Sequence, residues 1–193
     1  MADYRAIWAT CEAVIKLLES NYKPEYIDNT NLDFKIFLSK DFSQGMASGV
    51  SLFLYRIFFN NSHRTPSGRY RSDDQRYYTQ LPLDLHFLLT AWGKTASLQH
   101  TISGWMMRTL EDTPIIPTSF LHDVAPGIFR DNETIEISLA EMTTEDMLRL
   151  WEVTAQNEYQ VSVPYIARNV RIESTHLRAE GQPTQERTFD FMP

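Results

Sequence analysis

The sequence predicts an α+β domain in which a mainly antiparallel sheet of about five strands is packed by two to three helices. In several short stretches, apolar residues alternate with polar ones, which is typical of strands with one buried face. In others, apolar residues recur at steps of three and four, which is typical of amphipathic helices. No Pro- or Gly-rich linker divides the 193 residues, so we expect one main domain over residues 1–174.

A helix is expected near the start of the chain, over Tyr4–Ser20, with Asp3 as its N-cap. Its apolar stripe includes Cys11, the only cysteine in the sequence. A single cysteine excludes an internal disulfide, and we interpret it as a small buried hydrophobic side chain rather than a reactive thiol. A loop over Asn21–Asn31 follows the helix.

Two strands and a long loop come next. Over residues 34–39, Phe34, Ile36 and Leu38 alternate with Lys35, Phe37 and Ser39, which predicts a strand with one buried face. Val50–Phe59 is apolar on both faces, which predicts a central strand covered on both sides. Asn60–Arg76 is polar and rich in turn-forming residues, so we expect a long hairpin loop.

The middle of the chain has the clearest strand–turn–helix pattern. Leu81–Thr90 alternates as a half-buried strand, and Thr95–Glu111 follows as an amphipathic helix that ends before Pro114. We expect Trp105 on this helix to pack against the buried face of the strand. That face is lined by the alternating residues Leu83, Leu85 and Phe87.

The last third of the domain is less regular. Ile115–Asn132 carries several prolines and is expected to be irregular, and residues 134–139 alternate as another half-buried strand. Thr143, with an acidic residue three positions later, resembles a capping box and predicts a short helix. The final strand is expected over Tyr159–Ile172. Pro164 cannot donate to a strand ladder, which predicts an edge position or a bulge there.

Residues 175–193 are expected to form a flexible C-terminal arm, because they contain few apolar residues before Phe189 and Phe191. One interpretation is a tail that frays in solvent. The other is an arm whose two phenylalanines help add a strand to the open sheet edge of a neighbouring molecule. The sequence leaves both open.

Four successive segments carry a resemblance to a known family. They are LPLDLHFLLTAW (81–92), HTISGWMMRTLEDTPIIP (100–117), ISLAEMTTEDMLRLW (137–151) and YQVSVPYIARNVRIES (159–174). In order and spacing they resemble the N-terminal domain of the tail-terminator, or cap, proteins of extracellular contractile injection systems, such as the antifeeding prophage and the Photorhabdus virulence cassettes. The resemblance runs from about Trp8 to about Ser174, and does not cover the loop Asn60–Arg76.

The resemblance implies a phage tail-terminator-like fold and a structural role. Such a protein caps the distal end of the inner tube and sheath of a phage-tail-like particle, ends polymerisation and fixes particle length. The implied partners are sheath and inner-tube subunits, further copies of the same chain in a hexameric ring, and a second cap paralogue. An alternative is an adaptor that links the particle cap to a membrane or a partner protein.

Charge is unevenly distributed along the sequence, whose net charge is −7. Arg56–Arg76 holds five arginines and two aspartates, whereas Glu111–Glu158 holds eleven acidic residues and two arginines. Opposite charges of this kind suit a head-to-tail contact in a ring, although solvated loops and helix faces account for most charge runs. The interface candidates are Arg64, Arg69, Arg71, Arg76, Glu145, Asp146, Phe189 and Phe191.

Chemistry is less well supported by the sequence. Asp84 and His86 lie two apart on one strand face, where a carboxylate and an imidazole could serve a small hydrolase, but a polar surface pair is the interpretation we favour. A nuclease that uses the arginine-rich loop is disfavoured by the pI of about 5.2. The scattered histidines indicate no metal or cofactor. We therefore expect no enzyme activity and no nucleic-acid partner. The lack of an apolar span or signal peptide predicts no direct membrane insertion and cytoplasmic synthesis.

Overall fold

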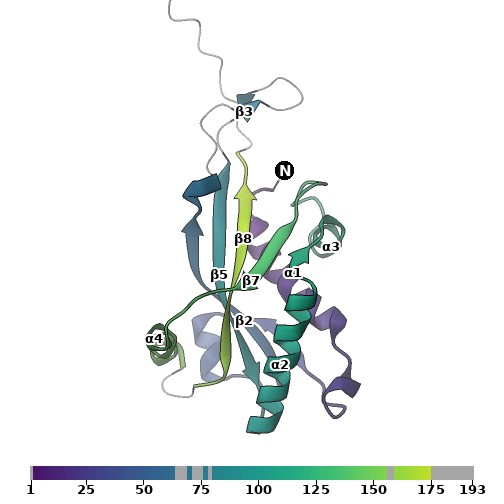
Figure 1. The fold of residues 1–193 in the computed structure, drawn as a ribbon, viewed down its shortest axis with the longest axis vertical. Helices are drawn as coiled ribbons and strands as arrows, with labels where there is room; N and C mark the ends of the chain where they lie inside the picture. Colours follow the sequence, from purple (N-terminus) through teal and green to yellow (C-terminus); the bar gives the residue numbers. More distant parts are fainter. Residues whose placement is uncertain (1, 64–68, 71–75, 78–79, 156–158, 175–193) are drawn as a thin grey trace, which may run out of the picture.

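The core of the protein is a mixed sheet flanked by helices (Figure 1). A computed structural model describes the chain except for residues 1, 64–68, 71–75, 78–79, 156–158 and 175–193. In the described residues the sheet has six strands: β1 (Asp33–Ile36), β2 (Gly49–Phe59), β5 (Leu81–Trp92), β8 (Ser162–Ile172), β7 (Ile135–Leu139) and β6 (Ile115–Ile116), in that spatial order. The helices are α1 (Ala6–Asn21), α2 (Ala96–Asp112), α3 (Thr118–Val124) and α4 (Thr144–Ala155). The expected α+β class is confirmed.

The pairing of the strands is mainly antiparallel. The long strand β5 lies between β2 and β8 and is antiparallel to both, and β7 is antiparallel to β8 and β6. Only β1 runs parallel to its neighbour β2 within the described sheet. In the segment expected as a hairpin loop, β3 (Arg69–Tyr70) and β4 (Arg76–Tyr77) pair as a separate two-stranded sheet among the described residues.

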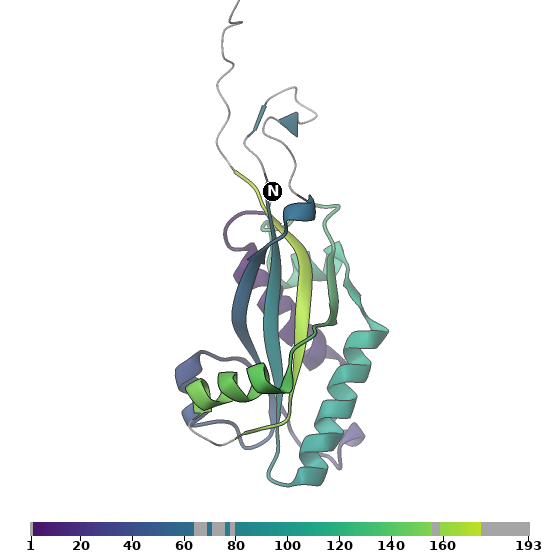
Figure 2. The same cartoon turned by 60° about the vertical axis from the view of Figure 1, so that its left-hand side comes forward.

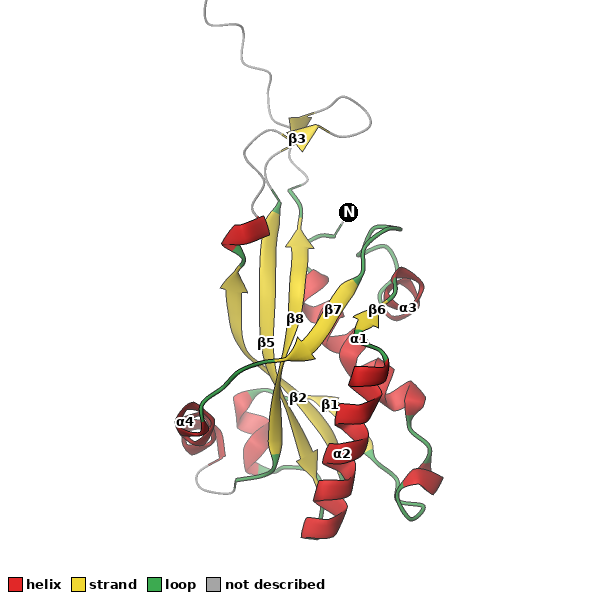
Figure 3. Ribbon diagram, in the orientation of Figure 1, coloured by secondary structure: helices red, strands yellow, loops and turns green. Residues whose placement is uncertain are grey.

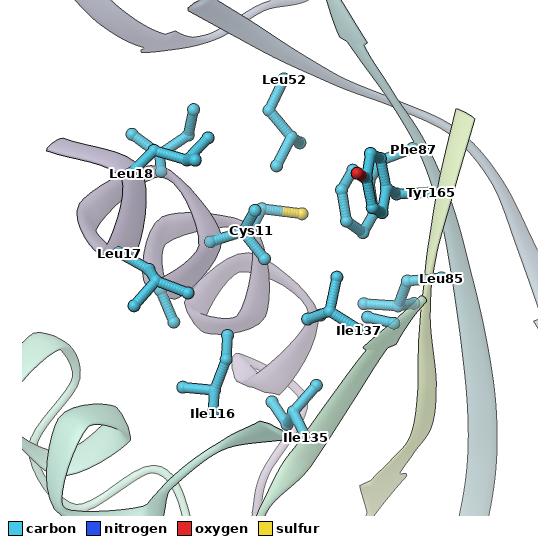
Figure 4. Close-up of a cluster of buried hydrophobic side chains, with 14 of the residues drawn as sticks. Cys11, Leu17, Leu18, Leu52, Leu85, Phe87, Ile116, Ile135, Ile137 and Tyr165 are labelled. Carbon is cyan, nitrogen blue, oxygen red and sulfur yellow. The ribbon is translucent and has the colours of Figure 1, made fainter. Parts of the chain in front are cut away.

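The main hydrophobic core lies between one face of the sheet and the helices α1, α2 and α3. Cys11 of α1 projects into it toward Leu52, Phe87 and Tyr165 (Figure 4). Burial raises the pKa of the Cys11 thiol to about 12, so little thiolate forms at neutral pH. The interpretation of Cys11 as a buried hydrophobic side chain is therefore confirmed.

Helix α2 packs on the same face of the sheet, but not with the side chain we expected at its centre. Its buried apolar residues are Ile102, Met106 and Leu110, which are spaced by four. Trp105 is only half-buried, and its indole meets the rings of Tyr22 and Phe34 at centroid distances of 5.1 and 6.0 Å. Trp105 packs against the main core that includes Leu83, Leu85 and Phe87, but only from its rim, because the fully buried stripe of α2 is rotated by one residue.

A second, smaller core lies on the opposite face of the sheet, beneath α4 (Figure 2). It joins Leu88 and Trp92 of β5 to Met147 and Trp151 of α4, with Phe42 between them. Thr143 caps the start of this helix, as the sequence signal predicts: the backbone N–H of residue 146 donates to Thr143 Oγ1 over 3.1 Å. The hydroxyl of Thr143 in turn donates to the aspartate at 146 over 2.7 Å.

Strand β2 agrees with the expected two-sided burial over half of its length. From Gly49 to Leu52 it is buried on both faces, with β1 on one side and β5 on the other. Beyond a register shift near Tyr55 it emerges into solvent, and Arg56 and Ile57 are exposed. The prediction was wrong for residues 56–58, which are exposed. Phe53 and Tyr55 still pack against the core beneath α4, and Leu54 and Phe59 pack against the main core.

Strand β8 is interior in the described sheet, between β5 and β7, so the expected edge position of Pro164 was wrong. The carbonyl of Pro164 accepts from the N–H of Ala140, just past the end of β7. The backbone N and O of a strand residue point to the same side, so the missing donor of this proline faces the place where β7 has ended. The bulge in β8 lies elsewhere, at Asn169, which has a φ of 60°.

Other differences from the expected elements are local. Ile115–Asn132, expected to be irregular, contains β6 and α3. Helix α1 starts at Ala6, two residues later than expected, and its N-cap is Arg5 rather than Asp3. Asp3 accepts the backbone N–H of Arg5 over 2.8 Å, before the helix begins. No helix in the part of the chain that the structure describes is long and apolar enough to cross a bilayer.

Candidate assembly surfaces

The acidic interface candidates lie at the start of α4. Glu145 and Asp146 are both exposed in its first turn. Glu145 forms an ion pair with Arg149 at 2.6 Å, and the carboxylate of Asp146 accepts a hydrogen bond from the hydroxyl of Thr143. Both carboxylates are therefore engaged within the chain, but they remain on the surface. Negative charge at a helix N-terminus is favourable, so part of their role is to stabilise α4 itself.

The basic candidates are only partly within the described residues. Arg69 and Arg76 lie on β3 and β4, where Arg69 pairs with Tyr77 and Tyr70 pairs with Arg76. Figure 1 draws this strand pair beyond the upper end of the main sheet, whereas α4 lies beside its lower half. The other basic and aromatic candidates lie outside the described residues; they are Arg64, Arg71, Phe189 and Phe191. The proposed contact between the two charged segments stays a prediction.

Asp84 takes a structural role on the face of the sheet opposite α1. Its carboxylate accepts two bonds from Asn60 Nδ2, at 3.0 and 3.2 Å, and one from the backbone N–H of Asn169 at 2.9 Å. Asn169 is the bulge residue of β8. The carboxylate thus accepts the backbone N–H of Asn169, which the bulge displaces from the hydrogen-bond ladder between β5 and β8. These bonds favour the polar-pair interpretation over an acid–base pair with His86.

His86 sits in an aromatic group on the same face. Its ring lies 5.3 Å from the ring of Phe58 and 6.2 Å from that of Tyr55. The guanidinium of Arg56 lies 3.6 Å over the Phe58 ring, which is a cation–π contact. Burial lowers the pKa of His86, and the charge of Arg56 lowers it further. These side chains make the upper half of this face both aromatic and cationic.

The lowered pKa of His86 predicts that the protein loses stability as pH falls from about 7 to about 5. In this range the unfolded chain binds the imidazole proton more readily than the folded chain, so stability rises with pH. His86→Phe keeps a ring and should make the dependence of the urea midpoint on pH shallower. Phe58→Leu disturbs the same group but keeps the imidazole, and should retain the slope. Equal slopes for His86→Phe and the unmodified protein would contradict this prediction.

A buried polar cluster closes the upper end of the sheet, where β8 ends. The carboxylate of Glu173 accepts from Gln80 and forms an ion pair with Arg130. The backbone N–H of Glu173 donates to the carbonyl of Ala2 over 2.9 Å. The cluster joins four segments that are far apart in the sequence, and no local pattern could have indicated it.

Three pockets on the described surface are lined by residues other than the suspected acid–base pair. One of about 160 Å³ is lined by Phe129 and Arg171, and one of about 330 Å³ by Trp151 and Tyr159. His86 lines neither of them. Among the described residues, no three His, Cys, Asp or Glu side chains gather closely enough to hold a metal ion.

Comparison with known families identifies the fold. A model of the Pvc16 N-terminal domain family matches residues 9–186. The chain belongs to this family. The match begins within α1 and continues past the end of β8 at Ile172, to residue 186. The resemblance expected from four sequence segments is therefore confirmed.

Two solved structures share the fold of this Pvc16 N-terminal domain. One is a PVC sheath/tube terminator in its extended state, from an extracellular contractile injection system, with a TM-score of 0.66 and 12% identity over 96% of this chain. The other is the anti-feeding prophage cap, a tube-terminating cap, with a TM-score of 0.62 and 14% identity over 93% of this chain. The matches span 63% and 59% of those proteins, so this chain covers less than two thirds of either. No curated protein matches the sequence.

Proposed function

We propose that this chain is a structural protein that caps the distal end of the tube and sheath of a phage-tail-like contractile injection system. The observation that carries the proposal is the shared fold with a sheath/tube terminator and a tube-terminating cap, over nearly the whole chain. Membership of the Pvc16 N-terminal domain family supports it independently of the coordinates. A cap of this kind ends polymerisation and so sets the length of the particle.

The proposed assembly is a ring of identical copies, six by analogy with the expected cap, that contacts sheath and inner-tube subunits and a second cap paralogue. A ring needs a head-to-tail contact between two different patches. The segment with Arg69 and Arg76 and the start of α4 with Glu145 and Asp146 offer opposite charges for it. Exposed ion pairs are individually weak, so such contacts need the particle end as a template.

The role proposed is recognition without catalysis. The hydrogen bonds of Asp84 to Asn60 and Asn169 support a structural role for this carboxylate, rather than acid–base catalysis with His86. The chain is proposed to fold in the cytoplasm and to join the particle there, without a nucleic-acid partner and without entering a bilayer. The runner-up function is an adaptor between the particle and a membrane or a partner protein.

Particle length tests the proposal. The chain is co-expressed with the tube and sheath subunits of its particle, or omitted, and particle length is measured by negative-stain electron microscopy. Omission is expected to produce over-long particles with open ends, because nothing stops polymerisation. Normal length with closed ends would overturn the capping role. Normal length combined with loss of particles from the membrane fraction would favour the adaptor instead.

A further inference from the structure

The second half of β2 leaves one edge of the sheet open (Figure 3). β1 pairs with β2 only over Gly49–Leu52, and the last backbone bond on that side runs from Phe37 N–H to the Leu52 carbonyl, at 2.8 Å. Over residues 53–58, β2 pairs with β5 on one side and with no described strand on the other. Alternate N–H and C=O groups of this stretch point away from β5, as a template for another strand.

The charged Arg56 and the register shift at Tyr55 give this open edge partial protection, yet apolar side chains lie exposed on both of its faces. Ile57 is 46% exposed on the face of the main core, opposite Leu85. Phe58 is 39% exposed on the other face, with Arg56 beside it. Exposed apolar edges promote association, and proteins normally shorten, charge or cover them. The far edge of the same sheet shows such a device, because β6 is only two residues long.

An incoming strand has to match both faces of this edge. The face of Ile57 favours apolar side chains, and the face of Arg56 favours an acidic one, so the fitting pattern is apolar–acidic–apolar. The chain carries this pattern once in its last residues, as Phe189-Asp190-Phe191. Alternation would set the two phenylalanines beside Ile57 and the carboxylate beside the guanidinium.

We propose that residues 187–192 of one copy add as a strand to residues 53–58 of β2 in a second copy. The 12 residues 175–186 that precede this strand can span up to about 40 Å when extended. Crossing from β8 to the open edge of β2 within one copy needs only about 15 Å, three strand spacings, so the tether reaches well beyond its own sheet. The contact is heterologous, as a ring requires. This strand-addition proposal depends on the ring of identical copies in the proposed function, and does not depend on the capping role.

Disulfide trapping between two variants tests the pairing. Full-length Ile57→Cys is mixed with full-length Phe191→Cys, oxidised mildly, and the disulfide-linked dimer is measured on a non-reducing gel. Ile115→Cys is the matched control, because Ile115 is an isoleucine 54% exposed at the opposite edge of the sheet. The native Cys11 is buried and its pKa is raised to about 12, so it contributes little to the trapped product.

The expected result is at least about tenfold more dimer from Ile57→Cys than from Ile115→Cys, because strand pairing raises the effective concentration of the two thiols. Arg56→Asp should lower the yield about twofold to fivefold, and adding Asp190→Arg to the partner should restore it. If Ile57→Cys does not fold, Phe58→Cys with Asp190→Cys probes the same edge from the other face.

Equal yields at the two edges would overturn the proposal. The double variant with both cysteines provides a second test. If it forms only an intramolecular disulfide, and the mixed single variants form no dimer, the proposal is also overturned, because the strand then pairs within its own copy. The trapping result is independent of particle length. Loss of capping and loss of strand pairing can therefore be told apart.

Discussion

Phe87→Ala is expected to lower the free energy of unfolding by about 3–5 kcal/mol. Phe87 is 1% exposed at the middle of β5, and its ring stacks on that of Tyr165 with a centroid distance of 6.2 Å and an interplanar angle of 14°. The substitution removes most of a buried ring from the main core, between the sheet and α1, and the surrounding elements cannot close the cavity. Domains of this size are stable by only about 5–15 kcal/mol, so much of the protein should become insoluble.

The matched control for Phe87→Ala is Phe58→Ala, on the neighbouring strand. Phe58 is 39% exposed and loses mainly its contacts with His86 and Arg56. Its cost should be less than half that of Phe87→Ala, and urea unfolding of both variants measures the difference. Similar costs would show that the core does not centre on the face of β5 that carries Phe87.

Gly49→Ala is expected to cost more than about 3 kcal/mol, although it adds only a methyl group. Gly49 has a φ of 151°, and a Cβ on it would lie 2.1 Å from the backbone carbonyl oxygen of Asp33. That oxygen belongs to β1, whose pairing with β2 starts at these two residues. The backbone of one strand has to move, which separates β1 from the sheet.

Gly104→Ala is the same substitution in the opposite context. Gly104 lies in α2, and apart from its chain neighbours and the backbone of its own helix, no atom lies within 4 Å of the position where its Cβ would be. Alanine is favoured over glycine within a helix by about 0.5–1 kcal/mol, so this variant should be more stable than the unmodified protein. Thermal melts of the two variants should therefore shift in opposite directions. Shifts of the same sign would contradict the close approach of β1 to Gly49.

Local patterns in the sequence determined much of the fold. The alternation from Leu83 to Leu89 placed the buried face of β5 correctly, and the four-residue signal at Thr143 placed the start of α4. Both succeed because strand alternation and helix capping depend only on neighbours in the chain. The order of four such segments was also enough to indicate the family, which the match to residues 9–186 confirms.

The tertiary structure alone decided which surfaces are covered. Val50 and Ile57 lie in one apolar strand, yet β1 covers the first and leaves the second exposed, because β1 is only four residues long. The sequence places Asp84 on the same strand face as His86, but only the folded structure shows that a bulge on another strand supplies the backbone donor that Asp84 accepts. The open edge of β2 and the partly buried ion pair of Glu173 and Arg130 likewise arise from segments that meet only after folding. A sequence pattern reflects the local conformational and burial tendencies of each residue. Which residues contact each other across the fold is determined by the packing of the whole sheet.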